Sequence, residues 1–269
     1  GGSGLFTKQG AGETALTSND SDFAGTVRIL EGKLTVAPGA LKNTLLSMVP
    51  GGTLAAPLAT LDTPLQIGAL GGTVDLDLAN MTARFGGGDH SAVWGGRFTA
   101  GNVILSRVSG SGIQTFLGGT SDAPFTAPSL STSGGTFRLQ SGVFAFTNAT
   151  NAVTARTSLF AEGTGRIEID GGARVTAGSG VRIHNGGRIV ASGDGTRLDI
   201  TAAPGGTNRV AFVGSFGGGA LEVTQGAVST ASHLVLGNAS EPNATSTVVV
   251  ANGGRLELAT LLQLEGAKA

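Results

Sequence analysis

The sequence contains no cysteine and no tyrosine, and only 13% of its 269 residues are charged. The absence of cysteine excludes disulfides and thiolate metal sites. A formal net charge of −1 argues against a nucleic-acid partner and against an anionic membrane surface. Because no run of about 18 apolar residues occurs, we expect no membrane-spanning helix. Nothing in the sequence indicates a cofactor or a metal, and we expect neither.

Glycine, by contrast, is abundant, with 47 residues, and 40% of the chain is apolar. This apolar content suffices for a continuous core and argues against disorder. A short unit recurs, in which a glycine precedes two apolar residues that are separated by one residue. Examples are GKLTV (32–36), GTFRL (135–139), GRIEI (165–169) and GRLEL (254–258). Alternation with a period of two is typical of half-buried strands, so we expect an almost entirely β protein. Only Ala40–Val49 could form a short helical turn or an irregular strand.

The spacing of these units discriminates between kinds of β fold. In residues 163–200 the expected strands begin about every eight residues, so that three strands take 22–23 residues. Like residues recurring at a three-strand interval favour a right-handed three-sided parallel β-helix, with about twelve rungs in the chain. A β-sandwich pair or a propeller is the alternative. The positions that coincide at this offset are Ile167 and Ile189, Ile169 and Ala191, Val175 and Leu198, and Leu198 and Leu221.

We interpret residues 1–269 as a single β-solenoid domain and expect it to be a segment of a longer chain. Four prolines mark residues 38–64 as an irregular insertion, where the register is hardest to assign. The glycine pairs are interpreted as corners. A phosphate-binding loop would instead place its glycines between a strand and a helix.

Residues 2–37, GSGLFTKQGAGETALTSNDSDFAGTVRILEGKLTVA, resemble the autotransporter-associated β-strand repeat of bacterial passenger domains. Ser-Asp-Phe-Ala-Gly at 21–25 replaces the usual Asn-Thr-Tyr-Ser-Gly turn of the repeat. Residues 65–76 and 233–258 look like segments that occur later in such passenger domains. The resemblance implies a secreted or surface-displayed bacterial β-helix associated with the outer membrane. The residues that fill the frame of the repeat are Gly4, Lys8, Gly10, Gly12, Leu16, Gly25, Val27, Gly32, Leu34 and Val36.

The family includes passengers with serine-protease and lipase activity, but neither a Gly-Asp-Ser-Gly nor a Gly-x-Ser-x-Gly motif occurs. We expect none of His90, His184 and His233 to be catalytic, and we interpret His184, which lies in an expected strand, as a surface residue. Polysaccharide-cleaving enzymes with this fold need clustered carboxylates. The pairs Asp75/Asp77 and Glu168/Asp170 have same-face spacing, and we interpret both as solvating groups that form ion pairs across rungs.

Trp94 is the only tryptophan and lies in the glycine-rich stretch 85–98. It is either an exposed residue that binds a glycan or a host surface, or a side chain packed between rungs. No amphipathic capping helix occurs at either end, so we expect further repeats of the chain or a second copy to associate end to end or laterally. The predicted function is that of a non-enzymatic extracellular structural or adhesive β-solenoid, with self-assembly into a filament or sheath as one form. A polysaccharide lyase or hydrolase is the alternative.

Overall fold

The computed structural model describes most of the chain. For the strands between residues 45 and 105, and for Val210, only the backbone is described. The described ranges are 4–17, 25–37, 45–48, 52–57, 65–67, 71–85, 92–105, 113–127, 129–147, 157–201, 210–214, 216–237 and 244–265. All statements on structure below concern these residues.

The described residues form 23 strands and no helix, so the prediction of an all-β protein is confirmed. The strands of the first half are β1 (Leu5–Lys8), β2 (Glu13–Leu16), β3 (Thr26–Ile29), β4 (Gly32–Val36), β5 (Leu45–Met48), β6 (Gly52–Pro57), β7 (Leu65–Ile67), β8 (Gly71–Phe85), β9 (Ala92–Leu105), β10 (Ile113–Leu117), β11 (Phe125–Ala127) and β12 (Ser129–Gln140). They are followed by β13 (Val143–Phe146), β14 (Leu159–Asp170), β15 (Arg174–Ala177), β16 (Val181–His184), β17 (Arg188–Ser192), β18 (Arg197–Ile200), β19 (Val210–Val213), β20 (Gly219–Thr224), β21 (Val228–Leu236), β22 (Ser246–Ala251) and β23 (Arg255–Leu264).

All pairings between these strands are parallel, and they form three ladders. Ladder I contains β1, β3, β5, β7, the ends of β8 and β9, the beginnings of β12 and β14, β16, β19, and the ends of β21 and β23. Ladder II contains β2, β4, β6, the beginnings of β8 and β9, β10, the ends of β12 and β14, β17, β20 and β22. Ladder III contains β11, β13, β15, β18 and the beginnings of β21 and β23. Long strands such as β14 bend from one ladder into the next.

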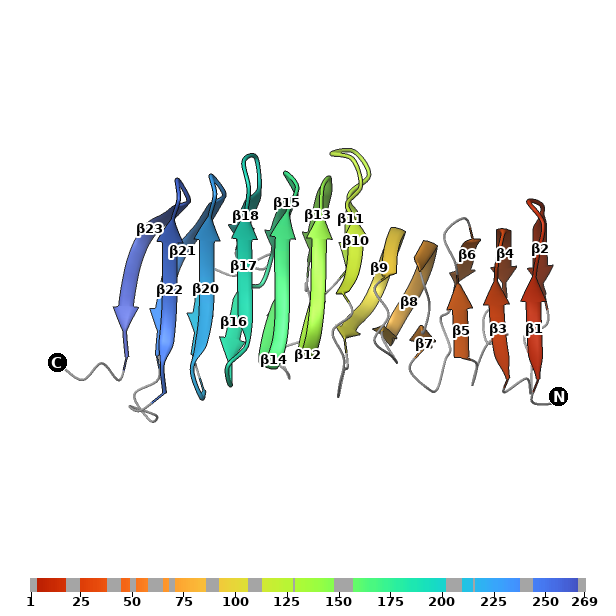
Figure 1. Ribbon diagram of the computed structural model, residues 1–269, viewed down its shortest axis with the longest axis horizontal. Helices are drawn as coiled ribbons and strands as arrows, with labels where there is room; N and C mark the ends of the chain where they lie inside the picture. Colours follow the sequence, from red (N-terminus) through yellow and green to blue (C-terminus); the bar gives the residue numbers. More distant parts are fainter. Residues whose placement is uncertain are drawn as a thin grey trace.

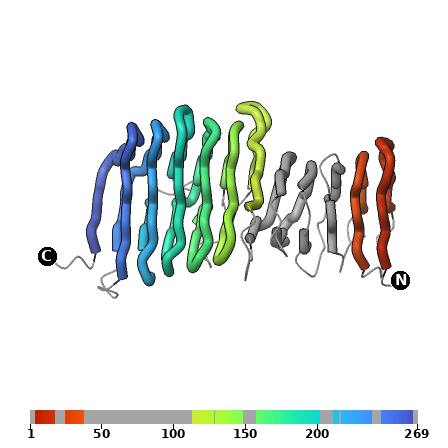
Figure 2. The backbone as a smooth tube through the Cα atoms, viewed as in Figure 1, coloured from red at the N-terminus to blue at the C-terminus, as the bar shows by residue number. Residues whose placement is uncertain are grey.

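The strands follow one another along the long axis of the molecule, and the two termini lie at opposite ends (Figures 1 and 2). In the described residues before β11, the chain alternates between ladders I and II. From β11 onward it passes through ladders I, II and III in the same order each time. We call the segment between paired residues of consecutive strands in one ladder a rung.

The predicted offset of 22–23 residues holds for one part of the chain. Ile167 pairs with Ile189 and Val175 with Leu198, as expected. The offset of 23 for the second pair arises because the corner before β18 contains one residue more than the corner before β15. Other rungs differ, since Leu5 pairs with Thr26, 21 residues later.

The expected coincidence of Leu198 with Leu221 is wrong. Leu198 pairs with Ser229, and Leu221 pairs with Ile189, 32 residues before it. The reason is the length of the connection from β18 to β19, which takes nine residues, 201–209. A regular period therefore cannot be extrapolated past this connection.

Within residues 38–64, the described strands β5 and β6 keep the register of ladders I and II. Thr26 pairs with Leu45, and Gly32 pairs with Gly52. Leu45–Met48 is a strand, so the described part of Ala40–Val49 contains no helical turn. The remainder of both segments lies outside the described residues.

The core lies between the ladders, and alternate residues are buried in most strands whose side chains are described, with exceptions that include β2, β22 and β23. In β14, for example, Ile167 and Ile169 are fully buried while Glu168 between them is partly exposed. The largest fully buried side chains are mostly phenylalanines, and they lie where ladder III begins. Phe116 contacts Phe125 and Phe137 with ring centroids 5.5 and 5.3 Å apart. These rings fill the interior at the point where a third strand is added to each rung.

The first rung is closed by a buried lysine. The Lys8 side chain is 4% exposed, and its Nζ atom donates hydrogen bonds to the backbone carbonyls of Gln9, Gly10 and Glu31. At Gly32 the backbone φ is +71°, and a Cβ atom would lie 2.3 Å from the Gly10 carbonyl oxygen. Lysine and glycine are therefore required at these positions by the geometry of the corner.

Candidate functional site

Trp94 lies in β9, on a strand of ladder II. The strand register places it between Gly72 of β8 and Phe116 of β10, and the Phe116 side chain is buried. The side chain of Trp94 lies outside the described residues. Its role as a surface binding residue therefore stays a prediction.

Asp75 and Asp77 lie in β8, whose side chains also lie outside the described residues. The register of the neighbouring strands brings no acidic residue beside either aspartate. Their four register partners are Ala55 and Arg97 for Asp75, and Pro57 and Ala100 for Asp77. These backbone pairings do not form the cluster of carboxylates that a polysaccharide-cleaving site requires.

The second carboxylate pair, Glu168 and Asp170, lies on the outer face of β14, and each residue is bonded to an arginine. The Nε atom of Arg166 donates to Glu168 Oε1 at 2.6 Å within the same strand. The Nε atom of Arg138 donates to Asp170 Oδ2 at 2.7 Å across the rung. The expected ion pair across rungs is therefore found for Asp170, whereas it is wrong for Glu168, whose partner Arg166 lies in the same strand.

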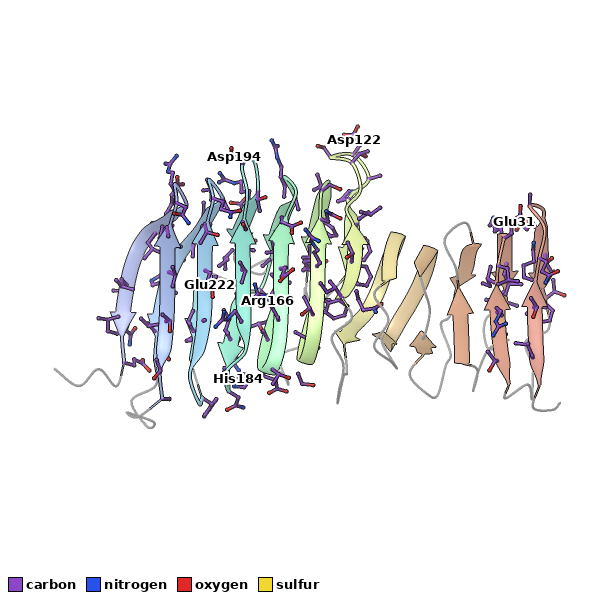
Figure 3. The ribbon with its side chains drawn as sticks, in the orientation of Figure 1. Glu31, Asp122, Arg166, His184, Asp194 and Glu222 are labelled. Carbon is purple, nitrogen blue, oxygen red and sulfur yellow. The ribbon has the colours of Figure 1, made fainter. Side chains whose placement is uncertain are left out.

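His184 ends β16 and packs in an aromatic corner. Its Nε2 atom lies 3.3 Å from Glu162 Oε2. Its ring centroid lies 4.7 Å from that of Phe160 and 5.8 Å from that of Phe216. Figure 3 shows His184 at the end of the strands opposite Asp194. The residue is mostly buried rather than exposed, so the expectation of a plain surface histidine is wrong for His184.

His233 is separate from this corner. The His233 Nδ1 atom lies 2.9 Å from the Ser232 hydroxyl oxygen, on the neighbouring residue. In the described part of the chain no carboxylate forms an ion pair with His233, so no catalytic triad is assembled there. His90 lies outside the described residues.

The outer surface carries arginine–carboxylate pairs on ladders II and III, and Figure 3 marks Arg166 and Glu222 on ladder II. Some bond within one strand and some bridge two rungs. They are Arg138–Asp170, Arg166–Glu168, Arg188–Glu222, Arg197–Asp199 and Arg255–Glu257. Among the residues with described side chains, no group of three or more histidine, aspartate or glutamate side chains could hold a metal ion.

A groove of about 540 Å³ lies on the outside of ladder III near its end. It is lined chiefly by residues of β18, β21 and β23, which pair with one another in this order. This volume lies within the range of ligand-binding clefts, about 300–1,000 Å³. Its apolar lining residues are Ile200, Ala231, Leu258 and Ala259, of which Ile200 and Ala231 belong to the core and Leu258 packs against it. The polar residues that line it are Thr176, Arg197, Asp199, Thr201, Thr230, Ser232 and Glu257.

Three of these polar groups form one column across successive strands, because Asp199 pairs with Thr230, and Thr230 with Glu257. The Asp199 carboxylate accepts hydrogen bonds from Arg197 Nε at 2.8 Å and from the Thr230 hydroxyl at 2.6 Å. Glu257 Oε1 accepts one from Arg255 Nη2 at 2.6 Å. The groove thus contains both hydrogen-bond donors and acceptors in fixed positions.

Neighbouring carboxylates in the groove favour the protonated form of Arg197. The hydrogen bond to Asp199 raises the pKa of Arg197 above its ordinary value, and the negative charges of Asp199 and Glu257 act in the same direction. Arg197 therefore remains protonated at any physiological pH.

The last described rung exposes apolar side chains that correspond to core positions of the preceding rung. Leu262 pairs with the buried Leu234 and is itself 54% exposed. Val250 pairs with the buried Val223 and is 46% exposed. No following strand is present to cover these residues in the described part of the chain.

The comparisons with known proteins give no match. No family model, no curated protein and no solved structure matches the chain. Within the described residues, no helix is long and apolar enough to cross a membrane.

The groove was not predicted from the sequence. Its residues lie 31 and 27 positions apart, at offsets that differ from the expected 22–23. A signal was nevertheless present, because arginine and a carboxylate alternate in RLD (197–199) and RLE (255–257). Residues two apart lie on the same face of a strand, so each of these triplets places an ion pair on the outer surface.

Proposed function

We propose that the chain is a right-handed three-sided parallel β-helix that serves as a non-enzymatic structural or adhesive segment of a bacterial surface protein. The observation that carries this proposal is the continuity of parallel ladders I and II along the described strands, joined from β11 onward by ladder III around one apolar core. The right hand follows from a general rule, since connections between parallel strands of one sheet are right-handed in about 98% of cases.

The resemblance of residues 2–37 to the autotransporter-associated repeat supports a secreted or cell-surface location. The structure gives a physical reason for the frame residues Lys8, Gly10 and Gly32, which together build the corner of the first rung. A repeat defined by such corner residues is suited to a long rod, because each rung needs only the next rung to pack against.

The arrangement of three acidic residues on ladder II supports a structural rather than a catalytic function. Each carboxylate of Glu168, Asp170 and Glu222 is bonded to an arginine, so none stands free as a general acid or base. A polysaccharide lyase or hydrolase remains the alternative. Release of reducing ends or of unsaturated products from a panel of polysaccharides would establish it and overturn the structural proposal.

The exposed core positions of the last rung support elongation by addition of a further rung of parallel strands. Its source is either a second copy of the chain or further repeats of the same chain. Exposed apolar ends of this kind bind other rungs, and head-to-tail binding of copies does not close, so that it produces a filament. At the start of ladder I, Phe6 packs against the core and lies at the register position that would meet Leu264 of another copy, a residue that is 59% exposed.

Negative-stain electron microscopy with light scattering over a concentration series tests this form of the function. Ladder I contains twelve strands about 4.8 Å apart, so stacked copies would give a filament with an axial repeat of about 58 Å. Leu262→Asp should abolish filaments, because a charge would replace an apolar contact. Gln263→Asp, on the outward side of the same strand, is the matched control. Monodisperse rods at every concentration would refute self-assembly and leave a spacer or adhesive segment.

A further inference from the structure

We propose that the groove on ladder III binds a neutral oligosaccharide. The inference rests on the adhesive form of the proposed function and names the class of its ligand. It uses the outward-facing polar side chains of ladder III, whereas elongation uses inward-facing positions of the last rung such as Leu262, although both involve the strand β23.

The first reason is the mixture of donors and acceptors that the groove presents. Arg197 bonds to Asp199 through Nε, which leaves its Nη1 and Nη2 atoms as donors. Glu257 bonds to Arg255 through Oε1, which leaves Oε2 as an acceptor. The hydroxyl of Thr176 can take either role. A sugar hydroxyl both donates and accepts, so it can satisfy both kinds of group at once.

The second reason is the balance of charge. Asp199 is neutralised by Arg197, and Glu257 by Arg255, within the groove and at its edge. An anionic ligand would meet two carboxylates, and a cationic ligand would meet two guanidinium groups. Neither ion gains a net attraction at such a site, whereas a neutral polar ligand faces no repulsion.

The third reason is the repetition of the polar column. Asp199, Thr230 and Glu257 present one polar side chain in each of three neighbouring strands, so the column spans about 10 Å. A chain of sugar units offers hydroxyls at regular intervals along a similar length. The apolar residues beside this column offer little surface, because Ile200 and Ala231 belong to the core and Leu258 packs against it, so recognition rests on the polar column.

The affinity should be weak. The groove is open, and no aromatic ring lines it, so the stacking that strengthens many sugar sites is absent from its lining. We expect a Kd of about 1–10 mM for a disaccharide. A rod carrying such a site in several copies would still adhere to a polymeric glycan through multivalency.

The test is a titration of the full chain with maltose and with cellobiose, followed by ¹⁵N–¹H NMR. Saturable shifts of the Thr176, Thr230 and Glu257 amide signals are expected. Asp199→Ala removes the carboxylate that orients Arg197 and Thr230, and it should weaken binding at least about tenfold. Glu222→Gln, which breaks an ion pair on ladder II instead, is the matched control and should bind as the parent does.

Three results would overturn the inference. One is the absence of saturable shifts up to about 100 mM sugar. Another is stronger binding of glucuronate or glucosamine than of the neutral sugars, which would make charge the recognised property. The third is equal loss of binding in Glu222→Gln. Glu257→Gln provides a second groove variant at a half-exposed position if Asp199→Ala fails to fold. Filament formation is measured separately, so failure of sugar binding is distinguishable from failure of the structural proposal.

Discussion

Asp170 accepts a hydrogen bond from Arg138, 32 residues before it, and this contact joins the outer faces of two consecutive rungs. The Asp170 side chain is only 21% exposed, and its Oδ1 atom is buried without a hydrogen-bond partner in the described structure. The contact raises the pKa of Arg138, chiefly through the hydrogen bond to Asp170. Arg138 thus stabilises a largely buried carboxylate, and its ion pair is not a fully solvent-exposed one.

Arg138→Gln should therefore destabilise the protein by about 1 kcal/mol, because Asp170 would lose its charged partner while remaining largely buried. The measurement is urea denaturation followed by circular dichroism. Arg255→Gln is the control, since Arg255 is 69% exposed and its pair with Glu257 should contribute less than about 0.5 kcal/mol. Equal losses for the two variants would contradict the distinction drawn between the two pairs.

Phe137→Ala should cost about 3–5 kcal/mol, because the ring is fully buried beside Phe116 and its removal leaves a cavity. Thermal unfolding with the enthalpy measured by calorimetry gives this value. Phe137→Leu is the matched variant, and it should lose less, because it retains most of the buried apolar surface. A loss below about 1 kcal/mol for Phe137→Ala would mean that the phenylalanines do not fill the interior where ladder III begins.

The strands themselves were predictable from the sequence, and the turn lengths were only partly so. Alternating apolar residues fixed which side of β14 faces the core, and the offset of 22 correctly paired Ile167 with Ile189. The pairing of Leu221 could not be found this way, because connections on the surface can lengthen without disturbing the buried positions. A period read from a few rungs therefore describes those rungs only.

The candidate site was less predictable than the fold. Asp199 and Glu257 each form part of an arginine–carboxylate triplet that the sequence displays, yet their alignment in one column depends on the register of β18, β21 and β23. The sequence drew attention instead to rare residues such as Trp94. A rare residue such as tryptophan is easy to notice in a sequence. The groove, however, is formed by common residues, and only the strand register brings them together.

Gly187→Ala should destabilise the protein by at least about 2 kcal/mol, because its Cβ atom would lie 2.2 Å from the carbonyl oxygen of Ala161. The obstruction is backbone, which cannot move aside without breaking the ladder. Gly12→Ala is the control, since nothing lies within 4 Å of a Cβ atom there. Equilibrium unfolding should leave Gly12→Ala within about 0.5 kcal/mol of the parent, and a similar loss in both variants would contradict a local steric cause.

The pKa of Glu13 lies below its ordinary value of 4.5, because its carboxylate accepts a hydrogen bond from the Thr35 hydroxyl and lies 3.3 Å from Lys33 Nζ. A lowered pKa in the folded state favours the ionised form. The associated stabilisation is therefore fully present above the unfolded-state pKa and is lost as the pH falls through the folded-state value. An NMR titration of the Glu13 carboxyl carbon should give a midpoint below 4.5 in the parent. Thr35→Val should move this midpoint upward, since it removes the largest cause, and Thr7→Val on ladder I should leave it in place. A midpoint at or above 4.5 in the parent would show that the contact between β2 and β4 does not persist in solution.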